Sequence, residues 1–235
     1  MQEHKLAAAT ALPIVFDGVL AIVGGGTVDT DLLRQLRADG AFLVGADGGG
    51  DVIAEAGFVP EAIIGDMDSL EDPDSWEGNT QLVRIAEQET TDFEKTLYAT
   101  SAPVTVALGM TGKRFDHTLA ALDAVARYAR DRRIVLVDEH DIALAVSGEF
   151  SFAVAAGERV SVHPLAQVTF ARSAGLNYPL DGLRLAPGER TGTSNAATVG
   201  PFSIEPGAGE RGAWLLILDK RHLQALIDRL LLAKA

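Results

Sequence analysis

The sequence contains no cysteine among its 235 residues, which excludes disulfide bonds and thiolate metal ligands. This composition is typical of cytosolic proteins, so we expect a cytoplasmic location. No apolar run approaches the roughly 18 residues that a membrane-spanning helix needs. The N-terminal segment, with one lysine and an acid before its small-residue patch, does not have the pattern of a secretory signal. We therefore expect no insertion into a membrane.

Basic residues are scarce as well. The chain has 20 Lys and Arg against 33 Asp and Glu, which gives a formal net charge of −13. Because nucleic-acid binding depends on lysines and arginines that neutralise phosphates, we expect no nucleic-acid partner. We interpret most of the acidity as a solvated surface that favours solubility. At a binding site, an anionic substrate would need a metal ion, whereas a cationic substrate would be attracted.

The first part of the chain alternates short apolar runs with segments of helical spacing. The apolar runs predict strands at residues 19–23, 41–47, 61–66, 81–86, 104–109 and 134–139. Helical spacing predicts helices at residues 29–39, 51–57, 91–100 and 116–131. This alternation predicts an α/β domain with a mostly parallel sheet, which we place at residues 1–145.

The composition changes near residue 140. Beyond it, alternating apolar segments separated by Gly and Pro predict strands at residues 149–155, 158–165, 167–172 and 212–218. We therefore predict a β-sandwich domain at residues 146–235, with a C-terminal helix over residues 220–234. The Gly-rich stretch 186–212 is too loop-rich for strands to be assigned, and loops of that length are often functional.

Acidic residues recur close to the ends of the predicted α/β strands. They are Asp47, Asp66, Asp68, Asp92 and Asp116. In a parallel α/β sheet, residues just past the strands gather along one edge, where ligands bind. Carboxylates gathered there repel one another unless a cation lies among them, and Mg²⁺ takes oxygen ligands and usually arrives with phosphates. The pattern predicts a Mg²⁺-dependent nucleotide site.

The pair Asp66 and Asp68 directly follows an apolar run. If this segment is extended, both carboxylates project to one side, roughly 6.6 Å apart along the strand. They could then share one metal ion or straddle two, and Gly65 would let a ligand approach the backbone. The alternative is that one carboxylate caps the next turn and the other is solvated.

A glycine run follows Asp47. Without side chains, Gly48 and Gly49 would let backbone N–H groups face a phosphate. The alternative is that Asp47 caps a helix beside flexible glycines. Further along, Thr91 and Glu94 fit a capping box, which places Asp92 in the first turn of a helix.

The segment 109–117 (GMTGKRFDH) combines glycines, cations, an acid and a histidine at a predicted strand-to-helix turn. Arg114 could hold phosphate oxygens in a bidentate way. Asp116 could orient Arg114, accept a proton or simply cap the helix. His117 is a further candidate catalytic residue, although a lone histidine is more often structural.

Six motifs in this order, GADGG, GDMDSL, TTDFEKTL, GKRFDHTLA, GLNYPL and TSN, resemble the thiamine pyrophosphokinase family. The resemblance runs from about residue 40 to residue 218. It implies a homodimer whose subunits each carry an α/β catalytic domain and a β-sandwich, with active sites shared between subunits. It also implies transfer of pyrophosphate from ATP to the hydroxyl of thiamine, which gives thiamine diphosphate and AMP.

The resemblance also implies roles for individual residues. The expected Mg²⁺ ligands are Asp66, Asp68 and Asp92. The chemistry of these residues and the resemblance together also predict the catalytic residues. They are Asp47, Asp92, Arg114, Asp116 and His117. The expected nucleotide-side residues are Gly48, Gly49, Thr91 and Lys113. Ser194 and Asn195 match the Ser-Asn that the family places beside thiamine.

Two positions depart from the family pattern, which usually has Asp in place of Glu89 and Gly in place of Lys113. The proton acceptor is open between Asp92 and Asp116. Three alternative functions also stay open at this point. They are a pyrophosphokinase that acts on another heterocyclic alcohol, a metal-dependent phosphohydrolase, and a noncatalytic nucleotide-binding sensor.

Overall fold

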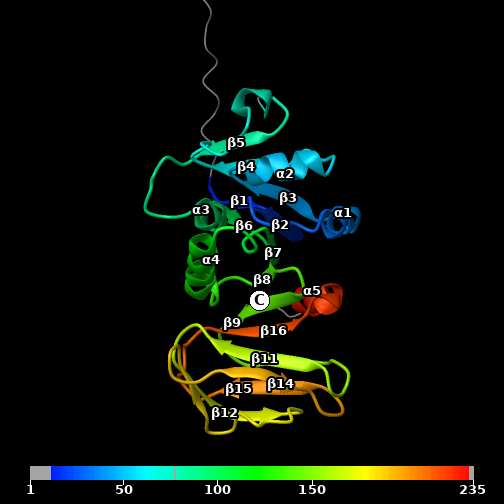
Figure 1. The fold of residues 1–235 in the computed structure, drawn as a ribbon, viewed down its shortest axis with the longest axis vertical. Helices are drawn as coiled ribbons and strands as arrows, with labels where there is room; N and C mark the ends of the chain where they lie inside the picture. The colour runs from blue at the N-terminus through cyan, green and yellow to red at the C-terminus, as the bar shows by residue number, and fades with distance from the viewer. Residues whose placement is uncertain (1–11, 77, 233–235) are drawn as a thin grey trace, which may run out of the picture.

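A ten-stranded sheet runs the length of the molecule in the computed structural model, which describes residues 12–76 and 78–232 (Figure 1). Its strand order is β14-β11-β16-β9-β8-β7-β2-β3-β4-β5. The strands from β8 to β5 pair in parallel, whereas β8, β9, β16, β11 and β14 pair antiparallel. Two architectures therefore share one sheet.

The parallel half alternates strands and helices along the chain. Its strands are β2 (Val19–Val23), β3 (Phe42–Ala46), β4 (Ala62–Gly65), β5 (Gln81–Arg84), β7 (Val104–Leu108) and β8 (Ile134–Val137). Its helices are α1 (Thr30–Ala38), α2 (Gly49–Glu55), α3 (Asp92–Ala99) and α4 (Phe115–Tyr128), with a 3₁₀ turn η1 (Pro73–Trp76) before β5. Short strands β1 (Ile14–Val15) and β6 (Thr100–Ser101) form a separate parallel pair.

Helices cover both faces of the parallel half. Ala21 and Val23 of β2 share one core with the apolar sides of α1 and α2. Leu20 and Ile22, which point the opposite way, share a second core with α3 and α4. Strands buried on both faces read as continuous apolar runs, which is why the sequence predicts them well.

The antiparallel half is a sandwich of two sheets. The large sheet contributes β9 (Asp141–Val146), β11 (Arg159–Pro164), β14 (Gly192–Ala196) and β16 (Trp214–Asp219). The small sheet has the order β10 (Phe150–Phe152), β15 (Phe202–Pro206), β12 (Val168–Ala174) and β13 (Arg184–Leu185). Between the sheets, the rings of Phe170 and Trp214 meet edge to face, with centroids 5.7 Å apart. The predicted fold class is confirmed.

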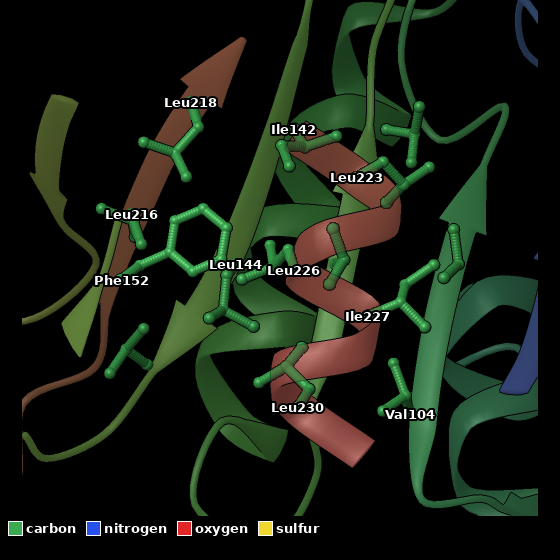
Figure 2. Close-up of a cluster of buried hydrophobic side chains, with 14 of the residues drawn as sticks. Val104, Ile142, Leu144, Phe152, Leu216, Leu218, Leu223, Leu226, Ile227 and Leu230 are labelled. Atoms are coloured by element: carbon green, nitrogen blue, oxygen red, sulfur yellow. The ribbon is translucent and has the colours of Figure 1, made fainter. Parts of the chain in front are cut away.

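The C-terminal helix links the two halves. The chain passes from β16 through a 3₁₀ turn η2 (Lys220–His222) into α5 (Leu223–Leu232). Figure 2 shows Leu226 directed toward Leu144 and Phe152, and Ile227 directed toward Val104 of β7. We assigned this helix to the sandwich, but it also packs on the parallel half. The domain boundary at residues 145/146 stays a prediction, and β9 crosses it.

Six strands of the described residues were not predicted from the sequence, namely β1, β6, β9, β13, β14 and β15. β14 and β15 lie in the stretch 186–212, which we left without strands, and β9 was not assigned at all. Gly, Thr, Ser and Asn make up most of β14, so neither alternation nor β-branched apolar residues mark it. The segments 1–11 and 233–235, which hold the start of the predicted first domain and the end of the predicted helix, lie outside the described residues.

None of the helices within residues 12–76 and 78–232 combines the length and the apolar character needed to cross a bilayer.

Candidate active site

A crevice lies at the carboxyl ends of the parallel strands. Its cavity of about 430 Å³ is lined by the loops after β2, β3 and β7 and by the start of α3. From β2 the chain continues to β3 on one side, and β7, which follows later, lies on the other side. Such a switch point is where open α/β sheets bind ligands. The predicted acidic site is therefore expected at this crevice.

Three of the predicted aspartates form a group beside this crevice. Asp47, Asp66 and Asp68 each offer a carboxylate oxygen, and these oxygens lie within 4.8 Å of one another. The segment between Asp66 and Asp68 is not extended as we expected, because Met67 has a φ of 70°. β4 ends at Gly65, and the backbone N–H of Asp68 turns back to Asp66 Oδ1 at 3.3 Å. The turn, rather than strand geometry, brings the two acids together.

Asp47 is the buried member of the group, with 2% of its surface exposed. Its Oδ2 accepts from the backbone N–H of Ser69 at 3.1 Å, whereas its Oδ1 is buried without a partner among the described residues. Burial raises the pKa of Asp47 to about 6, and the negative charges of Asp92 and Asp66 add to this effect. An unpaired buried carboxylate oxygen is costly, and a bound cation would satisfy it.

The donor set fits a hard divalent cation. All three groups are carboxylates, and Mg²⁺ prefers oxygen ligands and commonly uses one or two carboxylates together with phosphates. The group differs from the one that we predicted, because it contains Asp47 where we expected Asp92. The assignment of each residue as a metal ligand stays a prediction.

Asp92 is held by a lysine that the sequence analysis did not select. Lys95 is 2% exposed, and its Nζ lies 3.0 Å from Asp92 Oδ1 and 3.5 Å from Asp66 Oδ2. Burial alone would lower the pKa of Lys95, but the two carboxylates outweigh it and the pKa is raised. This buried ammonium group partly neutralises the acidic cluster. Its one sequence signal is its position three residues after Asp92 on a helix.

Asp66 has a second partner, Gln88, from the connection between β5 and α3. Gln88 Nε2 donates to Asp66 Oδ2 at 2.7 Å. This hydrogen bond is the main reason that the pKa of Asp66 lies below its usual range, and the charge of Lys95 contributes. Asp66 and Asp47 therefore have pKa values shifted in opposite directions, one by hydrogen bonding and the other by burial.

The segment after β7 forms the opposite wall of the crevice. Arg114 Nη2 and Nε donate to the two carboxylate oxygens of Asp116, at 2.7 and 3.2 Å. The pair that we predicted is thus formed, and both side chains are largely exposed. Lys113 Nζ donates to the backbone O of Gly25 at 2.8 Å, so it spans to the loop after β2. His117 also lines the cavity.

The glycines after Asp47 have a packing reason. A Cβ atom at Gly49 would lie 1.8 Å from the carbonyl oxygen of Val23, and one at Gly48 would lie 2.9 Å from that of Ser69. Close backbone approach therefore requires glycine here, and contact of Gly48 and Gly49 with phosphate stays a prediction. Gly48 lines the cavity.

Thr91 caps helix α3 as expected, since its hydroxyl accepts from the backbone N–H of Glu94 at 3.4 Å. The other half of the predicted capping box is wrong. The carboxylate of Glu94 pairs with Arg127 of α4 at 2.9 Å instead. Asp92 lies in the first turn of α3, as the sequence predicted.

Ser194 and Asn195 lie on β14, the edge strand farthest in order from β5 (Figure 1). Asn195 is 4% exposed. Its Oδ1 accepts from the backbone N–H of Tyr178 at 3.0 Å, and its Nδ2 donates to the carbonyl of the same residue at 2.7 Å. Within one chain, these two residues are not brought to the carboxylate group.

The fold and the crevice together define a class of protein, in which an α/β catalytic unit with an acidic crevice is joined to a β-sandwich. Residues 33–137 match the family model described as the catalytic domain of thiamin pyrophosphokinase. The resemblance to the thiamin pyrophosphokinase family that the sequence motifs indicated is thus confirmed, and this is a family of kinase-type enzymes.

Individual relatives agree with this assignment over most of the chain. Thiamin pyrophosphokinase 1 of Caenorhabditis elegans is 28% identical over 219 residues, which cover 83% of this chain and 90% of the relative. The crystal structure of thiamin pyrophosphokinase from Geobacillus thermodenitrificans is 25% identical, with a TM-score of 0.71, and covers 86% of this chain and 97% of that one. Yeast thiamin pyrophosphokinase, at 15% identity, shares the fold with a TM-score of 0.70 over 94% of this chain and 95% of its own.

Proposed function

We propose that this protein is a thiamine pyrophosphokinase, which transfers pyrophosphate from ATP to the hydroxyl of thiamine and forms thiamine diphosphate and AMP. The observation that carries the proposal is the carboxylate group of Asp47, Asp66 and Asp68 at the crevice of a catalytic domain of this family. Phosphate transfer depends mainly on positioning and on neutralising the phosphate charge, and this crevice has groups for both.

Asp47, Asp66 and Asp68 would hold Mg²⁺, with Asp92 next to them beside Lys95. When it is bound, the ion neutralises negative charge on phosphate oxygens. The carboxylates alone would repel ATP, so an anionic substrate requires both the cation and the basic groups of the site. Lys95 also reduces the negative charge of the site, because it keeps Asp66 and Asp92 paired with a positive charge.

Arg114 and Lys113 would face the phosphates from the opposite wall. In this state Arg114 donates to Asp116, and Lys113 donates to a backbone carbonyl. Asp116 therefore acts as the group that orients Arg114, whose planar guanidinium group can hold phosphate oxygens in a bidentate way. The proton acceptor for the thiamine hydroxyl stays open between Asp92 and Asp116, and His117 stays a candidate catalytic residue.

Thiamine carries a cationic thiazolium ring, which an acidic crevice would attract. We propose that Ser194 and Asn195 serve the thiamine side of the site from a second subunit. Their position on β14, at the opposite edge of the sheet from β5, supports a homodimer with shared active sites. A cytoplasmic location completes the proposal.

The direct test is to incubate the protein with ATP, Mg²⁺ and thiamine and to separate the adenine nucleotides from the thiamine phosphates. We expect AMP and thiamine diphosphate in equal amounts. ADP with thiamine monophosphate would instead indicate a kinase of another type. Phosphate release without thiamine would indicate a hydrolase, and ATP binding without turnover would indicate a sensor.

A further inference from the structure

Glu87, in the connection between β5 and α3, accepts hydrogen bonds from four donors. The backbone N–H groups of Glu89 and Thr90 donate to its Oε2 at 2.7 and 3.0 Å. The Tyr98 hydroxyl donates to its Oε1 at 3.1 Å, and the Thr90 hydroxyl donates to the same oxygen. One carboxylate thus ties together the loop and the last turn of α3.

This connection carries several groups of the candidate site. Gln88, which follows Glu87 directly, donates to Asp66 at 2.7 Å. Thr91 caps α3, and the first turn of α3 carries Asp92 and Lys95. Fixing the loop at residues 87–90 therefore fixes where Gln88 and the start of α3 lie.

Only a carboxylate suits this position well. An ionised Glu accepts hydrogen bonds on both oxygens, whereas Gln offers one acceptor oxygen and one donor group. The hydrogen bonds, led by that of Thr90, lower the pKa of Glu87 to about 2, so the group is ionised at neutral pH. Its negative charge also favours the protonated form of Lys95.

We propose that Glu87 is a positioning residue for the cation site. It holds the β5–α3 connection so that Gln88 and Lys95 keep the Asp66 carboxylate turned toward Asp47 and Asp68. Glu87 itself touches none of these three carboxylates and acts through its neighbours. The inference rests on the cation site of the proposed function, but not on the identity of the substrate that accepts pyrophosphate.

The test compares Glu87→Ala and Glu87→Gln with the control Glu205→Gln. Glu205 is likewise a half-buried carboxylate, and it pairs with Arg172 at 2.7 Å in the sandwich, so its change removes the same charge far from the crevice. Two readouts apply to each purified protein. Calorimetric titration measures Mg²⁺ affinity without substrates, and hydrogen exchange measures protection of the Glu89 and Thr90 amides.

We expect Glu87→Ala to weaken Mg²⁺ binding by about 10-fold, as for other residues that support metal ligands. The Glu89 and Thr90 amides should exchange faster, because they lose their acceptor. Glu87→Gln should recover part of both losses, and Glu205→Gln should match the wild type. Tyr98→Phe, which removes a single donor and leaves the loop amides paired, should have a smaller effect of the same kind.

Unchanged Mg²⁺ affinity in Glu87→Ala, with faster amide exchange, would overturn the inference, because Glu87 would then order the loop alone. Unchanged exchange would overturn it too. If Glu87→Ala does not fold, Glu87→Gln and Tyr98→Phe decide by the same readouts. A wild-type protein that binds Mg²⁺ but forms no thiamine diphosphate would contradict the proposed function without touching this inference.

Discussion

Asp47 and Asn195 are both buried polar side chains, and they lie in the two different halves of the molecule. Both polar atoms of the Asn195 side chain in the sandwich have partners, since Oδ1 accepts from Tyr178 and Ala196 and Nδ2 donates to Tyr178. Asp47 at the crevice keeps one buried oxygen without a partner among the described residues. Both were predicted as site residues.

The difference separates two kinds of role. A buried polar group whose polar atoms all have partners stabilises the fold, whereas a buried atom without a partner indicates an external ligand or an unfavourable strain. On this reasoning we propose that Asp47 contacts the cation directly, and that Asn195 acts on thiamine through the segment that it holds. Tyr178, whose backbone Asn195 binds at both polar atoms, presents a side chain that is 69% exposed.

The largest expected effect comes from the other two carboxylates of the group, half-buried Asp66 and exposed Asp68. Asp66→Asn and Asp68→Asn should each lower turnover by on the order of 10²-fold or more, because each removes a charged oxygen that we propose as a ligand of the cation. Circular dichroism should show an unchanged fold. Near-normal rates at saturating Mg²⁺ in both variants would contradict the assignment of these residues.

Arg114→Lys keeps the positive charge and removes the planar fork. We expect kcat to fall by about 10²-fold, as when one preorganised donor to a transferring group is lost. Asp116→Asn should lower kcat less, because it leaves the guanidinium group in place with a weaker partner. An unchanged rate in Arg114→Lys would mean that the Arg114–Asp116 pair is structural.

Asn195→Ala should raise the KM for thiamine while leaving the KM for ATP nearly unchanged. It should also lower the free energy of unfolding by about 1–3 kcal/mol, because the Tyr178 backbone loses its partners. Steady-state kinetics and urea denaturation measure the two effects. Ser194→Ala is the matched control for stability, because the hydrogen bond from its backbone N–H to Ser161 is retained.

Subunit mixing tests whether the two halves meet across a dimer. Asp68→Asn and Asn195→Ala proteins, mixed in equal amounts and assayed at low thiamine, should recover about a quarter of wild-type activity. Half of the dimers are then mixed, and one of their two sites carries neither change. No recovery after verified exchange of subunits would place each site within one chain.

The smallest effect concerns the metal-free protein. Because its pKa is raised to about 6, ionised Asp47 destabilises the fold, and this cost grows as the pH rises from about 4 to about 6. Asp47→Asn removes the cost, so its Tm should exceed that of the wild type at pH 8, on the order of 5 °C. The difference should vanish near pH 4. Equal Tm values at pH 8 would contradict the argument from burial.

Asp66→Asn offers a comparison in the same assay. Its carboxylate already has favourable partners in Gln88 and Lys95, which lower its pKa. Removal of this charge should therefore not stabilise the metal-free protein as removal of the Asp47 charge does. A rise in Tm equal to that of Asp47→Asn would show that general repulsion, rather than burial, governs the cluster.

The sequence predicts the parallel half better than the rest, for a physical reason. Strands such as β2 and β7 are buried on both faces and give continuous apolar runs, and aspartates follow several of them closely. β14 carries little apolar patterning, so its place in the sheet depends on pairing with β11, which is far away in the chain.

The aspartates of the candidate site could be selected from the sequence, because charged residues stand close to the ends of apolar strands. Lys95 and Gln88 could not be selected in this way, because their contacts depend on where the β5–α3 connection brings them in space. The turn at Met67 could not be predicted either, since a positive φ at a residue other than glycine has no clear sequence signal.

The most direct test of the comparison between Asp47 and Asn195 is the effect of Mg²⁺ on thermal unfolding without substrates. A ligand at about 100 times its Kd stabilises the folded state by about 2.7 kcal/mol. Mg²⁺ should raise the Tm of the wild type and of Asn195→Ala by the same amount, and should leave that of Asp47→Asn unchanged. An equal rise in Asp47→Asn would contradict the account, because the incomplete buried oxygen would then have no part in binding the cation.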